Sequence, residues 1–142
     1  MDSIKNYVLV SLGIVGAFIA EAFGGWDLSV QTLVIFITVD FTLGLLIAAV
    51  WGKSSKTETG KIDSRACWQG LIRKGGIFLV VLIAARLDLV MQTDGFVRTA
   101  VIMYFIGNEG ISIVENLGTM GVPLPKWLRH RFEALKNDSK NK

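Results

Sequence analysis

Carboxylates and amides recur at helical spacing in an otherwise apolar segment near the end of the chain. Within residues 96–117 these polar side chains are Asn108, Glu109, Ser112, Glu115 and Asn116. At about 100° per residue they fall within roughly a third of the helix circumference. Their spacing matches no catalytic motif, so we expect no enzyme. A polar stripe of this kind is stable in lipid only inside a sealed polar core or around a water-filled lumen.

Further ionisable residues lie near the middle of two other apolar segments. Asp40 occurs within residues 30–51, and Arg86 and Asp88 occur within residues 75–91. A bare charge at the bilayer centre costs at least about 2.5 to 3.5 kcal/mol. We therefore expect Arg86 to pair with Asp40, Asp88 or Glu109. Because Arg86 and Asp88 point to different sides of a helix, at least one acid needs a proton, water or a neighbouring subunit.

The segments that position these charges are long and apolar. Hydrophobic residues make up 51% of the 142 residues, and a membrane-spanning helix needs roughly 20 of them in succession. Four stretches meet or approach this length: 7–23, 30–51, 75–91 and 96–117. The remainder is too short for a separate folded domain. The sequence therefore predicts an all-α membrane protein, a single domain over residues 1–142 with four transmembrane helices.

Small residues mark one face of each of the first two segments. They are Gly13, Gly16 and Ala20 in the first segment, and Gly44 and Ala48 in the second. Small side chains let helix backbones approach closely where the hydrophobic effect no longer drives association. We expect both faces to contact other helices.

Lysine and arginine gather in two stretches, a basic linker at 52–74 and a basic tail at 123–142. The short turns at 24–29 and 92–95 contain neither residue type. The positive-inside rule therefore places both termini and the linker in the cytoplasm.

Two alternatives to this topology are open. In the first, three segments span the membrane and the first or third lies in the interface. In the second, the first segment is a cleaved signal peptide, because Ala20-Glu21-Ala22 resembles a cleavage site after an apolar core.

The basic tail has the pattern of an amphipathic helix. Leu128 and Phe132 repeat at helical spacing beside Trp127, Arg129 and Arg131. Such a helix lies on a membrane with its apolar face in the acyl region and its cations at anionic headgroups. We predict a cytoplasmic helix bound to anionic lipids of the inner leaflet, and no nucleic-acid binding. The lone Cys67 lacks the partners of a metal or haem motif, and we expect no cofactor or metal.

Several motifs follow one another in a fixed order along residues 35–135. They are Asp40-x-x-x-Gly44, Arg73-Lys74 entering a segment with Asp88 near its end, Asn108-Glu109-Gly110-x-Ser112-Ile113-x-Glu115-Asn116 and Gly121-x-Pro123-x-Pro125. This order resembles that of the toxin-secretion and phage-lysis holins. The resemblance implies a multi-pass protein of the bacterial inner membrane that forms homo-oligomers. It also implies that the membrane is permeabilised at a set time to release an endolysin or a toxin, with an antiholin as a possible regulator.

Two other functions fit the same residues. Asp40, Arg86 and Glu109 could form a relay in a small ion or proton channel or transporter. Alternatively, the protein could be a non-conducting regulator of a holin. On the holin reading, subunits gather through their small-residue faces and then rearrange so that the polar stripe from Asn108 to Asn116 lines water.

Overall fold

The computed structural model describes residues 2–138 and contains five α-helices connected by short segments. They are α1 (Asp2–Ala22), α2 (Leu28–Leu46), α3 (Ser64–Met91), α4 (Phe96–Thr119) and α5 (Lys126–Asp138). A π-helical stretch, Ile47–Trp51, continues α2. No strand occurs among residues 2–138. The predicted all-helical class is therefore confirmed.

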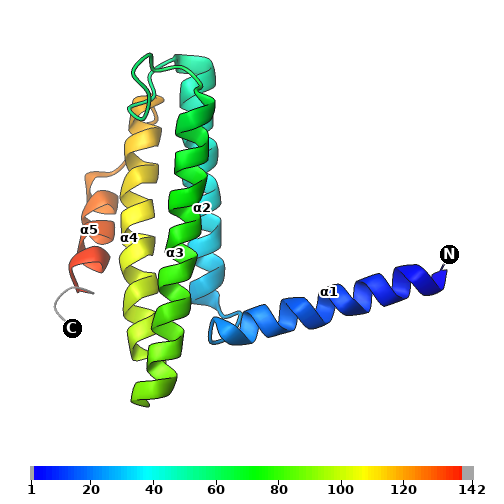
Figure 1. The fold of residues 1–142 in the computed structure, drawn as a ribbon. Helices are drawn as coiled ribbons and strands as arrows, with labels where there is room; N and C mark the ends of the chain where they lie inside the picture. The colour runs from blue at the N-terminus through cyan, green and yellow to red at the C-terminus, as the bar shows by residue number, and fades with distance from the viewer. Residues whose placement is uncertain (1, 139–142) are drawn as a thin grey trace.

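Helices α2, α3 and α4 lie side by side as an antiparallel bundle, whereas α1 projects away from it (Figure 1). The core between the three helices is built from Leu33 and Ile37 of α2, Val81 of α3, and Ile102 and Ile106 of α4. On α2 and α4 these residues recur at the four-residue spacing that brings side chains to one face, and Ile77 precedes Val81 on α3 by the same spacing. The side chains of α1 are exposed almost throughout.

Three helices, not the four that we expected, are long and apolar enough to span a membrane. They are Ser3–Ala22, Leu28–Trp51 and Phe96–Thr119. The expected span at 75–91 is too short to count as a fourth helix of this kind. A longer segment of α3 includes Lys74 in addition to Arg86 and Asp88, and these three charges make it too polar. Even so, α3 runs alongside α2 and α4 for most of their length (Figure 1).

The second half of the predicted linker at 52–74 is helical, because α3 begins at Ser64. Asp63 caps this helix: its carboxylate accepts hydrogen bonds from the backbone N–H groups of Arg65, at 3.3 Å, and Ala66, at 3.2 Å. A side-chain oxygen at this position satisfies amides that have no partner within the helix. The first turns of α3 are polar, so apolar content alone does not reveal them. The loop is therefore limited to residues 52–63.

The predicted tail helix is present as α5, and it packs along α4 (Figure 1). Gly107 and Gly110 form a notch in α4 that receives α5: the Phe132 ring lies against Gly110, and the backbone of α5 at Phe132 and Lys136 lies against Gly107. The same ring meets Phe36 of α2 edge to face, with 5.7 Å between ring centroids. A Cβ on Gly107 would lie 2.7 Å from the Phe132 carbonyl oxygen, and one on Gly110 would overlap the Phe132 ring. The absence of both side chains therefore permits the close contact. The last part of the predicted tail, residues 139–142, lies outside the described residues.

Gly110→Ala is expected to displace α5 from α4. Alanine normally stabilises a helix by about 1 kcal/mol relative to glycine, so any loosening must come from the new methyl group against Phe132. We expect trypsin to cut the detergent-solubilised variant several-fold faster after Arg129 and Arg131. Gly118→Ala is the matched control, since a Cβ there meets nothing within 4 Å. Equal cleavage rates in the two variants would contradict the notch.

Candidate functional site

Three charged side chains from three helices meet inside the bundle. The Lys74 ammonium of α3 lies 2.8 Å from the Asp40 carboxylate of α2, and it also donates a hydrogen bond to Glu109 of α4. The side chains of Asp40 and Glu109 are 1% and 3% exposed, and that of Lys74 is 14% exposed. One cation therefore bridges two buried acids and links all three helices.

Asp40 has further partners on α4 and in the loop. Ser112 Oγ donates to it at 2.5 Å and Asn116 Nδ2 at 2.9 Å, while the half-exposed Lys56 ammonium lies 3.8 Å away. Among residues 2–138, Lys74 is the one hydrogen-bond partner of Glu109. We call Asp40, Lys74, Glu109, Ser112 and Asn116 the lysine cluster. When all its groups are ionised, the cluster holds two negative charges against one positive, and Lys56 supplies a second cation at its edge.

A cavity of about 290 Å³ borders the lysine cluster. Its lining includes Asp40, Lys74 and Glu109 together with Arg73 and Asn108. A water molecule occupies about 30 Å³ of liquid volume, so the space is large enough for several. Polar groups and space for water therefore coincide at the place where the two acids meet.

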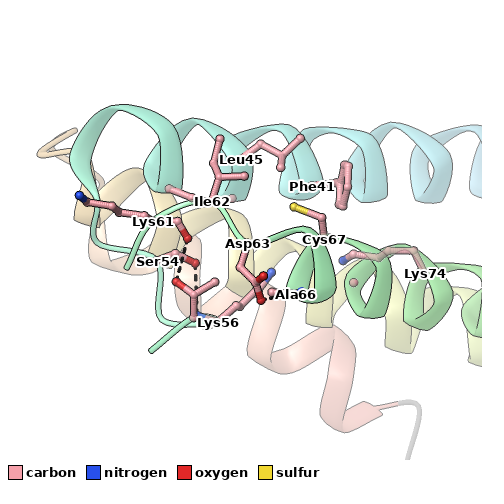
Figure 2. Close-up of a pocket in the computed structure, with 14 residues that line it drawn as sticks. Phe41, Leu45, Ser54, Lys56, Lys61, Ile62, Asp63, Ala66, Cys67 and Lys74 are labelled. Carbon is pink, nitrogen blue, oxygen red and sulfur yellow. Dashed lines mark hydrogen bonds between the residues drawn. The ribbon is translucent and has the colours of Figure 1, made fainter. Parts of the chain in front are cut away.

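A smaller pocket of about 50 Å³ lies between α2, α3 and the loop at 52–63. Figure 2 shows Cys67 of α3 and Phe41 of α2 approaching each other across it. Gly44 and Ala48 line the same pocket, so the structure places these two small residues where α2 faces α3 and the loop.

The small residues of α1 are placed differently. A Cβ on Gly13 or Gly16 would meet nothing within 4 Å. Ala20 and Gly16 instead border an apolar space of about 430 Å³ at the bend between α1 and the bundle. Within the described residues, the expected helix contact at Gly13 and Gly16 therefore has no counterpart in a single copy of the chain.

A second polar cluster lies at the opposite end of the bundle, around the buried Arg98 of α4. Its guanidinium donates to the Asp27 carboxylate at 2.7 Å and to the carbonyl oxygens of Phe23, at 2.5 Å, and Gly25, at 3.0 Å. This hydrogen bonding lowers the pKa of Asp27. Arg98 thereby attaches the turn between α1 and α2 to the start of α4.

Asp88 completes this arginine cluster of Asp27, Asp88 and Arg98. Its carboxylate accepts the backbone N–H groups of Val97, at 2.9 Å, and Arg98, at 2.8 Å. These are unpaired amides of the first turn of α4, where the helix dipole also favours a negative charge. Asp88 therefore has a structural role, in that it joins the end of α3 to the beginning of α4.

Arg86 lies exposed on α3, and no ion pair or hydrogen bond within residues 2–138 involves it. The cation beside Asp40 and Glu109 is Lys74, a residue of the linker that the sequence predicts at 52–74. The sequence signal that places Lys74 in a helix is Asp63, a residue type that favours the start of a helix. With α3 beginning directly after Asp63, Lys74 lies well inside α3. In the hairpin of α2 and α3, Asp40 precedes the loop at 52–63 by nearly as many residues as Lys74 follows it. The two side chains therefore lie at the same level of the bundle.

The predicted stripe of α4 is divided between two neighbours. Glu109, Ser112 and Asn116 face α2 and α3 within the lysine cluster. Asn108 and Glu115 lie toward α5 instead.

Two contacts define this second group. Lys136 donates to Asn108 at 3.1 Å, and the Arg129 guanidinium lies 3.4 Å from the exposed Glu115 carboxylate. In a single copy, both parts of the stripe are therefore engaged by other helices.

The residues expected to anchor the tail at a membrane surface lie on two faces of α5. Leu128 and Phe132 are partly buried toward α4, whereas Trp127, Arg129 and Arg131 are exposed. Arg129 additionally pairs with Glu133 at 2.9 Å, one turn along the helix. The helix therefore has the amphipathic division that the sequence predicted, with its apolar face against protein.

Lys74→Met should destabilise the bundle strongly, because it leaves two buried carboxylates without their shared cation. Breaking a buried ion pair from one side costs about 3 to 5 kcal/mol. We expect a loss of this order in the free energy of unfolding, followed by circular dichroism in detergent micelles. Arg73→Met, at the exposed neighbouring position, is the control. If the two variants unfold alike, Lys74 does not hold the helices together.

The arginine cluster predicts a pH dependence. Because the pKa of Asp27 is lower in the folded state, its contribution to stability is fully present above the ordinary value of 3.8 and is lost as the pH falls below it. Asp27→Asn retains a cap for α2 but removes the charge that faces Arg98. The difference in melting temperature between wild type and this variant should shrink as the pH drops below 3.8. A difference that is constant with pH would contradict the ion pair.

The model of the bacteriophage holin family matches residues 17–137. An uncharacterised protein of Clostridium perfringens (strain 13 / Type A) is 35% identical over 133 residues, which cover 92% of this chain and 93% of that protein. An uncharacterised protein of Listeria innocua is 34% identical over 140 residues, 95% of this chain and 94% of the relative.

A relative from a phage carries a functional description. The probable holin of Bacillus phage phi105 is 37% identical over 82 residues, which cover 58% of this chain and 61% of that protein. No solved structure matches the chain. Since the family model covers most of the sequence, including both polar clusters, the chain belongs to the bacteriophage holin family.

Proposed function

We propose that the protein is a phage holin that oligomerises in the bacterial inner membrane and permeabilises it at a set time. The resulting lesions give an endolysin access to the cell wall and cause lysis, or release a toxin. The match of residues 17–137 to the holin family carries this proposal. The probable holin of phage phi105 and the three helices that are apolar enough to span a membrane support it.

In the proposed topology, α1, α2, α3 and α4 all cross the membrane and both termini lie in the cytoplasm. The basic loop at 52–63 and the basic helix α5 support this orientation by the positive-inside rule. The crossing of α3 is supported by its position along α2 and α4 (Figure 1). Lys74, the charge that makes α3 too polar by composition, is matched by Asp40 and Glu109.

The proposed lesion requires more than one copy. Between the lysine cluster and the arginine cluster lies an apolar layer in which Leu33, Val81 and Ile102 are at most 1% exposed. Tight apolar packing of this kind excludes water from the middle of the bundle. Water therefore passes the membrane only after the helices of several copies rearrange.

The lysine cluster sets the barrier to that rearrangement in our proposal. Separating Lys74 from the two acids exposes charges that cost at least about 2.5 to 3.5 kcal/mol each near the bilayer centre. The cost falls once neighbouring copies bring polar groups or water to the cluster. A barrier that depends on the local density of copies gives a delay followed by sudden permeabilisation.

Glu109→Gln is expected to shorten the delay before lysis. The variant removes one of the two charges that Lys74 holds, so α4 separates from α3 more easily, while the protein still inserts. The measurement is the optical density of a bacterial culture that expresses the variant with an endolysin, alongside the amount of protein in the membrane fraction. Glu58→Gln, in the exposed loop, is the matched control. Equal delays at equal membrane levels would overturn the role of the cluster.

A second candidate is a small proton or ion channel, which is favoured by the cavity of about 290 Å³ beside Asp40, Lys74 and Glu109. A channel predicts saturable flux in cells that survive. A holin predicts abrupt growth arrest after a delay, hastened by an uncoupler. A non-conducting regulator predicts neither effect when the protein is expressed alone.

A further inference from the structure

Helix α5 covers one continuous face of α4. Phe132 fills the notch at Gly107 and Gly110, and farther along the same face the Arg129 guanidinium lies 3.4 Å from Glu115. Near the other end of α5, Lys136 donates to Asn108 at 3.1 Å. The covered face therefore combines two glycines with two polar side chains of α4.

The outer face of docked α5 suits water better than lipid. Trp127 is 62% exposed, and Lys126, His130 and Arg131 are exposed beside it. Yet α4, against which this helix lies, is apolar and long enough to span a bilayer. In a membrane, docked α5 would hold its basic face beside acyl chains, where charges are costly.

A second position of α5 avoids this conflict. At the inner surface of the membrane, Leu128, Phe132 and Leu135 would enter the acyl region while the basic residues meet anionic headgroups. The partly buried and exposed faces of α5 coincide with the faces that such a surface helix needs. The same helix thus has two competing positions, one on α4 and one on the membrane.

When α5 leaves, the face of α4 that it covered needs a new partner. Acyl chains offer no hydrogen bond to Asn108, whereas the amide of a second Asn108 both donates and accepts. Gly107 and Gly110 allow two helix backbones to approach closely, as small residues do between membrane helices. A surface that complements itself fits a two-fold contact between identical chains.

We propose that α5 is a latch that covers the surface through which α4 helices of two copies associate. Docked α5 keeps copies apart, and its release to the membrane surface starts their association. This proposal rests on the proposed holin function and names the step at which oligomerisation is controlled.

A chemical tether tests the latch. In a Cys67→Ser background, Glu115→Cys and Arg129→Cys place two thiols at positions whose native side chains meet at 3.4 Å. A short bismaleimide joins them in detergent, and the protein is then reconstituted into phosphatidylglycerol liposomes that contain a dye. We expect the tethered protein to stay monomeric and to release dye at least tenfold more slowly than the same variant without reagent. Single-cysteine variants treated with the reagent control for modification alone.

The opposite change should have the opposite effect. Phe132→Ala loosens α5 without altering α4, so we expect a shorter delay before lysis in induced cells. Trp127→Ala removes an aromatic side chain from the exposed face of the same helix, and it should not shorten the delay.

The outcomes separate the latch from the function beneath it. Failure to form the intramolecular tether, or equal dye release with and without it, would overturn the latch while leaving a permeabilising protein. Equal delays for Phe132→Ala and wild type would do the same. If no form of the protein releases dye or lyses cells, the holin function itself is overturned.

Discussion

The bundle depends on one ammonium group shared by two carboxylates. Lys74 lies between Asp40 and Glu109, so one residue from each of α2, α3 and α4 meets at a single point. Hydrocarbon tolerates none of these charges alone, and each is accommodated only by the other two helices. The contact therefore fixes how the three helices align along their length. It also explains why α3, which is too polar by composition, lies within the bundle.

The rest of the molecule is arranged around this fixed point. Ser112 and Asn116 occupy the remaining acceptor positions of Asp40, and the apolar layer of Leu33, Val81 and Ile102 separates the lysine cluster from Arg98 at the other end. The two helices outside the bundle are α1, which is exposed along its length, and α5, which packs on α4. Rearrangement between copies can therefore involve these outer helices before the bundle itself changes.

Much of the architecture could be predicted from sequence, because apolar length and helical periodicity are local properties. The helices that contain Asp40, Glu109 and Phe132 follow from them, as does the grouping of Glu109, Ser112 and Asn116 on one face. Partners across helices could not be predicted, because they depend on helix rotation and on where α3 begins. The depth of Arg86 in an apolar segment predicts it as the buried cation, whereas Lys74 holds that place.

The position of α5 depends on a partner in a distant part of the chain. The spacing of Leu128 and Phe132 predicts the two faces of α5. An amphipathic pattern does not indicate whether lipid or protein covers the apolar face. The choice between lipid and protein was decided by Gly107 and Gly110 on a distant part of the chain, which form a notch for Phe132. Such complementarity between two helices has no signature in either helix alone.

The hydrogen bonds from Arg98 to the turn between α1 and α2 determine which side chains of that turn can vary within the family. Two of its three partners there are main-chain oxygens, those of Phe23 and Gly25, and every amino acid supplies such an oxygen. As far as these two hydrogen bonds are concerned, the side chain at position 23 is thus free to diverge, whereas Asp27 takes part through its carboxylate. The limit is conformational, since Gly24 and Gly25 both adopt positive φ angles that other residues rarely accept. The main-chain part of this junction therefore requires only an arginine on one side and a glycine pair on the other, and the Asp27 carboxylate adds an ion pair to it.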